Sequence, residues 1–212
     1  MKRTHIGLGI LAMVAACGAA SALSPANNRV GSDAAPGLVI EVDRSFARLK
    51  PLRFPIEDLT NAERWIFVAA DRKHHVKKMV IVQFEKVQQG SDFRFRYPSR
   101  PPRQFGAQTY RFGTFAYDDA AAAKREPAKE PGLTRAFLHD AGYTPARMYR
   151  VARLARVTDP GGMAEAIIFY MENADATPPR GKPDADGDYS LSGAEAAALT
   201  VRMQRAVKAV RG

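Results

Sequence analysis

The stretch RWIFVAADRKHHVKKMVIVQFEKV (residues 64–87) contains two apolar segments joined by a short polar one. Residues 64–70 and 76–87 are rich in valine, isoleucine and aromatic residues, which fit the pleated, half-buried surface of a strand. The connection DRKHH (residues 71–75) is polar and short enough to reverse the chain. The stretch therefore predicts a β-hairpin and an antiparallel sheet built around it.

Strand patterns continue on the C-terminal side of this hairpin. FRFRY (residues 93–97) alternates strictly between aromatic residues and arginines, and QTYRFGTFAY (residues 108–117) alternates until Gly113 shifts the phase. A glycine inside a strand often marks a β-bulge, so we expect one at Gly113.

A second hairpin is expected from MYRVARLARV (residues 148–157) and AEAIIFYMEN (residues 164–173). The arginines of the first segment recur at every third residue, a spacing that also fits a helix. The connection contains DPGG (residues 159–162), which is turn chemistry between two runs rich in β-branched and aromatic residues. We therefore favour two strands over a helix here.

Helices are predicted for residues 118–125, 131–141 and 193–211. The first is alanine-rich, with acid at its start and base at its end, as the helix dipole favours. The second is amphipathic and is followed by Gly142, a typical C-cap. The expected fold is α+β: an antiparallel sheet of about five to seven strands with a few helices on one face and a C-terminal helix.

The N-terminal residues 1–22 resemble a bacterial secretory signal peptide, with a basic start, an apolar run at residues 6–16 and small residues after it. Residues 14–17 (VAAC) resemble a lipobox, in which Cys17 would carry the lipid. Cys17 is the only cysteine in the sequence, and cleavage after Ala22 is the alternative. We expect export, with the protein in the periplasm, anchored to the outer membrane or secreted. The rest of the chain divides into a flexible linker at residues 23–36, a domain at residues 37–176 and an acidic loop with a C-terminal helix at residues 177–212.

The sequence has a formal net charge of +10 at pH 7, and without Lys2 and Arg3 it keeps 30 basic and 22 acidic residues, or +8. In a cell envelope this charge favours an anionic partner, such as phospholipid head groups or acidic glycans, and nucleic acid is not expected. The alternative is that the charge only maintains solubility.

Arginines gather in and around the aromatic segment 93–97. Guanidinium groups match phosphate and carboxylate oxygens bidentately, so the pattern predicts a groove for an anionic ligand. The simpler alternative is a half-buried strand whose aromatic residues face the core and whose arginines face water. The ligand-binding candidates are Arg94, Arg96, Arg100, Arg103 and Arg111.

The sequence contains no nucleophile elbow, P-loop, dinucleotide-binding fingerprint or HExxH zinc motif. Carboxylates such as Glu85, Glu165 and Glu172 could meet in space, although their spacing does not indicate it. Glu165 and Glu172 are expected to pair with arginines across the second hairpin. We name no catalytic residue, and a hydrolase built from scattered carboxylates is the less favoured alternative.

DADGDYSLSGAE (residues 184–195) resembles an EF-hand calcium loop over these residues only. Tyr189 stands where that loop has glycine, and the prolines before the loop exclude an entering helix. Ser192 and Glu195 also form the pattern of a capping box, which explains them without a metal. The candidate calcium ligands are Asp184, Asp186, Asp188, Ser190, Ser192 and Glu195.

These patterns together favour an exported, lipid-anchored envelope protein that binds or scaffolds an anionic partner. An EF-hand-like calcium-binding envelope protein is the second hypothesis, and a hydrolase without a recognisable motif is the third.

Overall fold

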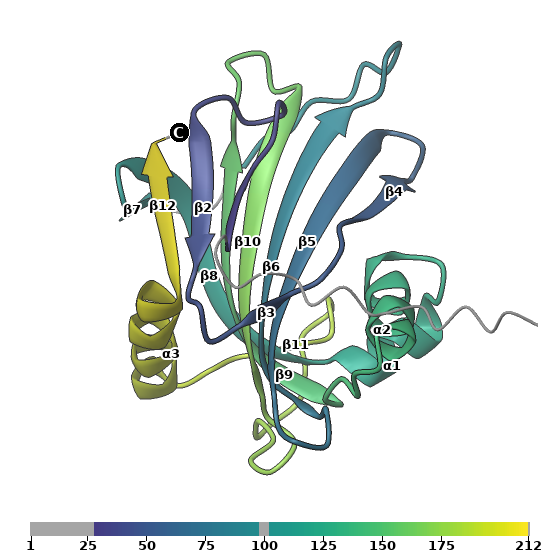
Figure 1. Ribbon diagram of the computed structural model, residues 1–212, viewed down its shortest axis with the longest axis vertical. Coiled ribbons are helices and arrows are strands. Elements are labelled where there is room, and N and C mark those ends of the chain that lie inside the picture. The colour runs from purple at the N-terminus through teal and green to yellow at the C-terminus, as the bar shows by residue number, and fades with distance from the viewer. Residues whose placement is uncertain (1–27, 98–101, 212) are drawn as a thin grey trace, which may run out of the picture.

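The computed structural model describes residues 28–97 and 102–211. Over these residues it has a nine-stranded sheet, a three-stranded sheet and three helices (Figure 1). The strands are β1 (Arg29–Gly31), β2 (Leu38–Val42), β3 (Ala47–Arg48), β4 (Leu52–Ile56), β5 (Thr60–Ala70), β6 (Val76–Val87), β7 (Pro102–Phe105), β8 (Gln108–Asp118), β9 (Met148–Val157), β10 (Ala164–Asn173), β11 (Asp188–Tyr189) and β12 (Val207–Arg211). The helices are α1 (Asp119–Arg125), α2 (Glu130–Asp140) and α3 (Gly193–Ala206). The α+β class is as expected, but the strands outnumber the five to seven predicted.

The large sheet is antiparallel and runs in the order β11-β8-β9-β10-β6-β5-β3, with β4 paired to β5 and β7 to β8. Both predicted hairpins are confirmed, since β5 pairs with β6 and β9 with β10. Strand β10 also pairs with β6, which joins the two hairpins into one sheet. At the turn between β5 and β6, the Asp71 carboxylate accepts hydrogen bonds from the N–H groups of Lys73 and His75, so the polar connection closes tightly.

The central strands alternate their side chains between two faces of this sheet. What we call the closed face carries Phe67, Val80, Val82, Leu154 and Ile168, and the three-stranded sheet and α3 pack on it. What we call the open face carries Ile66, Val68, Met79, Ile81 and Val151, and α2 packs on it through Leu138. Helices therefore lie on both faces, which corrects the expectation of helices on one face.

The C-terminal segment ends as a strand. Helix α3 stops at Ala206, and β12 pairs with β2 from Val207 opposite Val42 to Arg211 opposite Leu38. The backbone N–H and C=O groups along the edge of β2 need hydrogen-bond partners, and the backbone of residues 207–211 (VKAVR) supplies them. The predicted helix over residues 193–211 is therefore wrong for residues 207–211.

Two predictions inside the large sheet are also wrong. Residues 93–97 form no strand; the N–H of Phe95 donates instead to the carbonyl of Gly162 in the turn between β9 and β10. Residues 91–97, which we call the 91–97 loop, lie against the open face. Gly113 marks no bulge, because β8 keeps a regular register with β9 and places Gly113 opposite Arg153.

The first described residues are packed into the domain. Strand β1 pairs with β2, and Val30 and Ala35 are buried in the core of the closed face. The flexible linker expected at residues 23–36 is therefore corrected for residues 28–36.

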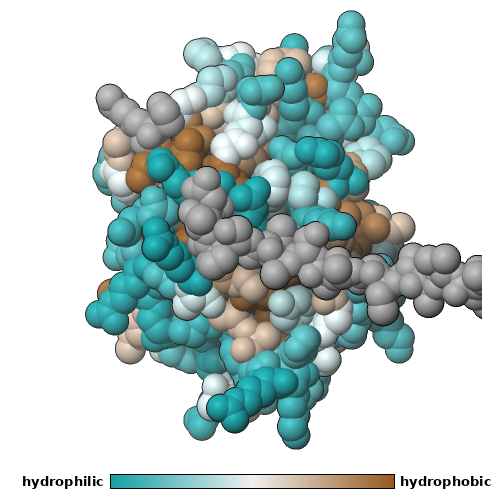
Figure 2. Space-filling view, in the orientation of Figure 1, coloured by the Kyte–Doolittle hydropathy of each residue, from teal (hydrophilic) through white to brown (hydrophobic). Residues whose placement is uncertain are grey.

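Hydrophilic side chains cover most of the surface in Figure 2, with smaller hydrophobic patches between them. Among the described residues, Leu59 and Val201 are the large hydrophobic side chains that are exposed. Most apolar side chains are thus buried against one face or the other of the large sheet.

Candidate functional site

The strand register places the side chains of the open face in rows across the strands. Counted from the side of the β5–β6 turn, the four central rows are Phe115, Val151, Met171, Met79 and Val68; Gly113, Arg153, Phe169, Ile81 and Ile66; Arg111, Ala155, Ile167, Gln83 and Arg64; and Val157, Glu165, Glu85 and Ala62. The open face therefore changes from apolar at one end to polar and charged at the other.

A buried polar network joins this face to the start of α2. The Arg64 side chain, 5% exposed, donates from Nε to Gln83 Oε1 at 2.5 Å and from Nη2 to Glu130 Oε1 at 2.6 Å. It also donates to the hydroxyl of Thr134. A buried guanidinium needs such a counter-ion and acceptors, because an unpaired buried charge is strongly unfavourable. Arg64 thereby fixes α2 over the apolar rows.

Two buried carboxylates lie directly opposite each other in the polar row. Glu85 and Glu165 are 5% and 3% exposed and face each other across β6 and β10. Glu85 accepts hydrogen bonds from Gln83 Nε2 at 2.6 Å and from the Thr60 hydroxyl at 3.1 Å. Glu165 accepts one from the hydroxyl of Tyr97, which brings the 91–97 loop onto the sheet.

Burial raises the pKa of Glu165 to about 7, although the Tyr97 hydrogen bond acts in the opposite direction. The negative charge of Glu85 contributes to the rise, and the pKa of Glu85 is itself raised by burial. Two carboxylates this close in a buried site ionise together only at a large free-energy cost. The pair therefore tends to retain one proton.

A cavity of about 400 Å³ lies between the open face, α1 and α2. Its apolar part is formed by Met79, Ile81, Phe115, Val151, Phe169 and Met171, all from the first two rows. Ala122 of α1, Pro131 of α2 and the carboxylates Asp186 and Asp188 also line the cavity. Volumes of about 300–1,000 Å³ with a mainly apolar lining and a few polar groups are typical of small-molecule sites.

Most charged groups around the cavity are already paired. Glu130 binds Arg64, as described above, and Asp119 binds Arg135 at 2.6 Å. Glu126 binds Lys129 at 3.0 Å. Arg125 and Arg153 also line the cavity, and neither forms an ion pair with any described residue. The unpaired cationic groups of the cavity are thus these two arginines.

Arg153 is half-buried in the middle of the open face. Its Cζ lies 5.8 Å from the ring centroid of Phe169 and 5.7 Å from that of Tyr97. One of its N–H groups donates to the Tyr97 hydroxyl at 3.4 Å. That hydroxyl in turn donates to Glu165, so Tyr97 connects the arginine to the buried acid pair.

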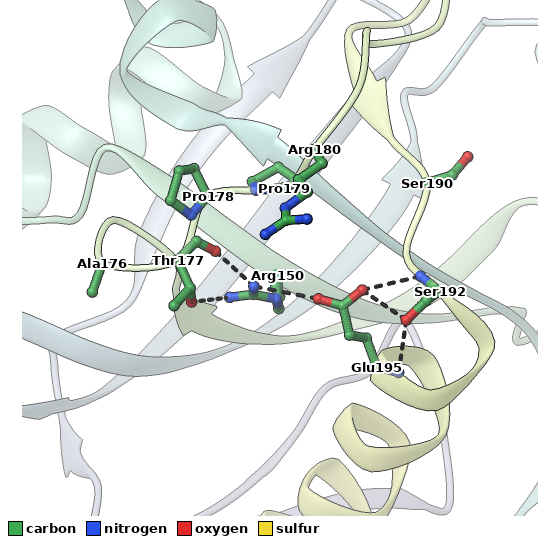
Figure 3. A pocket seen from close by; sticks show the side chains of 9 residues that line it. All are labelled: Arg150, Ala176, Thr177, Pro178, Pro179, Arg180, Ser190, Ser192 and Glu195. Atoms are coloured by element: carbon green, nitrogen blue, oxygen red, sulfur yellow. Dashed lines mark hydrogen bonds and ion pairs between the residues drawn. The ribbon is translucent and has the colours of Figure 1, made fainter.

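A second cavity, of about 750 Å³, lies at the N-terminal end of α3 (Figure 3). Its central cation, Arg150, donates to the carbonyl of Thr177 at 2.6 Å and pairs with Glu195 at 3.4 Å. Glu195 also accepts from the N–H of Ser192 at 3.1 Å, which completes the predicted capping box. These groups use their hydrogen-bonding capacity on one another. The contacts in this cavity therefore hold the segment after β10 against the start of α3.

The structure does not bring the described candidate arginines into one groove. Arg94 donates to the carbonyl of Phe93 at 2.6 Å, and Arg96 is exposed. Arg103 stacks on the ring of Phe112, with Cζ 4.7 Å from the ring centroid. Arg111 lies next to Phe112 in β8 and so points to the opposite face. Arg100 and Cys17 lie outside the described residues.

The acidic segment 184–195 begins with a tight turn. Asp184 Oδ1 accepts hydrogen bonds from the N–H groups of Asp186 at 3.0 Å and Asp188 at 2.9 Å. Asp188 and Tyr189 then pair with β8. Over the described residues, no group of three or more His, Cys, Asp or Glu side chains is arranged to hold a metal ion. Calcium binding stays a prediction that this arrangement does not support.

Sequence reasoning missed Arg153, Tyr97 and Gln83 as site residues. It also paired Glu165 and Glu172 with arginines of β9, whereas Glu165 binds Tyr97 and Glu172 binds Arg202 of α3 at 2.7 Å. The available signal was the alternation of β6, where Gln83 and Glu85 follow Met79 and Ile81 on one face.

No family model, no curated protein and no solved structure matches this chain. In the part of the chain that the structure describes, no helix is both long and apolar enough to cross a membrane.

Proposed function

We propose that the protein is an exported, lipid-anchored envelope protein that binds a small amphiphilic molecule in the open-face cavity. The observation that carries the binding function is a cavity of about 400 Å³ with an apolar floor and, in its wall, the unpaired cation Arg153. Phe115 and Phe169 of this floor are half-exposed, and a ligand that displaces water from their apolar surface lowers the free energy. The net positive charge of the sequence supports an anionic rather than a cationic ligand.

The buried acid pair does not favour the alternative of a hydrolase. Both Glu85 and Glu165 are buried, Tyr97 of the 91–97 loop binds Glu165, and neither carboxylate lines the cavity, so a substrate held there has no access to them. Their hydrogen bonds to Gln83, Thr60 and Tyr97 assign them to holding the sheet and the loop together.

Binding is tested with N-phenyl-1-naphthylamine, a neutral dye that fluoresces in apolar sites. We expect saturable binding, weakened about tenfold by Phe169→Ala, because the ring forms part of the cavity floor. Phe112→Ala is the matched control, since Phe112 is also a half-buried phenylalanine but points to the closed face. Equal dye affinity in the two variants would show that the dye binds outside this cavity.

Export and anchoring are tested separately by mass spectrometry of the protein from envelope fractions. A mature chain that starts at Cys17 and carries the mass of a diacylglyceryl group is expected. An unmodified chain that starts at Leu23 would contradict the anchor and leave the binding function intact.

A further inference from the structure

The guanidinium of Arg153 in the cavity has N–H donors that no described residue uses. A guanidinium has five N–H donors. The one hydrogen bond of Arg153 to the described residues goes to the Tyr97 hydroxyl, at 3.4 Å. The aromatic rings of Phe169 and Tyr97 hold the guanidinium within 6 Å and shield it from water on those sides. Such a partly desolvated guanidinium is a strong receptor for an anion.

The strand register places a glycine beside this cation. Arg153 lies between Phe169 of β10 and Gly113 of β8 in one row of the open face. Because glycine has no side chain, nothing from β8 covers the guanidinium in that row. The glycine that the sequence suggested as a bulge thus adds no side chain next to Arg153.

The charges around the cavity leave Arg153 as the cation available to a head group of one negative charge. The other unpaired arginine among the described lining residues, Arg125, shares the cavity with Asp186, which offsets its charge. A carboxylate has a single charge, and its two oxygens match the fork of one guanidinium. A phosphate monoester carries nearly two charges near neutral pH, and a neutral alcohol uses the fork poorly.

We propose that the ligand is an amphiphile with a carboxylate head, bound by Arg153, whose apolar chain lies against Phe169 and Phe115, two half-exposed apolar side chains that line the cavity. This inference rests on the proposed binding function and assigns its substrate class. Arg153 determines the choice of head group, and the apolar rows bind the chain.

The test is displacement of N-phenyl-1-naphthylamine by ligands that share a decyl chain, below their micelle concentrations and at pH 8. Decanoate should displace the dye at concentrations at least about tenfold lower than decanol, decyl phosphate or decyltrimethylammonium. Arg153→Gln should weaken decanoate about tenfold and leave decanol unchanged.

Two further variants separate recognition from folding. Arg156→Gln, a control on the same strand but the opposite face, should keep the preference for decanoate. Gly113→Val keeps Arg153 and adds a side chain beside it, and should weaken decanoate more than decanol. Valine suits a strand, so this variant is expected to fold.

The outcomes distinguish the inference from the proposed function. If the dye does not bind wild type, the proposed function fails. If all four ligands displace it equally, if another head group is preferred, or if Arg153→Gln weakens decanoate and decanol alike, binding stands and the carboxylate assignment is overturned.

Discussion

The same strands form two faces that are covered in different ways. On the closed face, Phe67, Val82 and Ile168 have no exposed surface, because a second sheet and α3 lie on them. On the open face, Phe169 is next to Ile168 in sequence yet half-exposed, and Arg153 lies beside it. Burial of apolar area supplies most of the stability of a domain. The closed face holds the larger buried cluster and so contributes more to stability, whereas the open face combines a smaller buried cluster with a cavity and buried charges.

Ile168→Ala should have the largest effect on stability. Removing a fully buried isoleucine side chain costs about 2–5 kcal/mol, whereas Phe169→Ala should cost about 1 kcal/mol because the ring is only half-buried. Urea unfolding at pH 7 measures both losses. Dye binding by the folded fraction should change in the opposite order, with Phe169→Ala the weaker binder. Equal losses of stability would break the distinction between the faces.

A carboxylate on each face should respond to pH with opposite sign. The pKa of Glu165 rises from 4.5 to about 7 on folding, so the folded protein holds this proton more tightly than the unfolded chain. The group therefore lowers the free energy of unfolding as pH rises from about 4.5 to about 7, by up to about 3 kcal/mol. Glu165→Gln cannot ionise and still accepts from Tyr97. It should be more stable than wild type at pH 8, by up to that amount, and equal to it at pH 4.5.

Glu172, whose side chain points to the closed-face side, is the matched control. Burial acts to raise its pKa, but hydrogen bonds from Arg202 outweigh burial and lower the pKa. Its stabilising contribution is present above the unfolded-state pKa and is lost as pH falls through the folded-state value. Glu172→Gln should therefore be less stable than wild type at pH 8. Urea unfolding of both variants at pH 4.5 and pH 8 measures the two signs, and the same sign in both would contradict this assignment.

Local patterns were enough to predict the hairpins, α1, α2 and the capping box of α3. Each depends on residues close in sequence, such as the β-branched runs around residues 71–75 or Ser192 with Glu195. The end of α3 could not be predicted in the same way. Strand β12 forms because β2, more than 160 residues earlier, offers an unpaired edge. A partner that distant leaves no mark in a local window.

The candidate site shows the same limit more clearly. Arg153 and Phe169 are neighbours only because of the register between β9 and β10, and Glu85 meets Glu165 only because β6 pairs with β10. The sequence did contain a partial signal, since Gln83 and Glu85 break an otherwise apolar face of β6. What they contact depends on which strand lies beside them. The sequence prediction therefore placed the anion site at the arginines nearest to aromatic residues in sequence.

The smallest expected effect on stability concerns a buried hydroxyl group without a hydrogen-bond partner on the closed face. The hydroxyl of Tyr110 is buried with no hydrogen-bond partner among the described residues, whereas that of Tyr170, on the same face, donates to Glu172 at 2.7 Å. Tyr110→Phe removes an unsatisfied group and should stabilise the protein by about 1 kcal/mol, while Tyr170→Phe loses a charge-assisted hydrogen bond and should destabilise it by about the same amount. Urea unfolding at pH 7 gives both values. Destabilisation by Tyr110→Phe would mean that the hydroxyl has a hydrogen-bond partner.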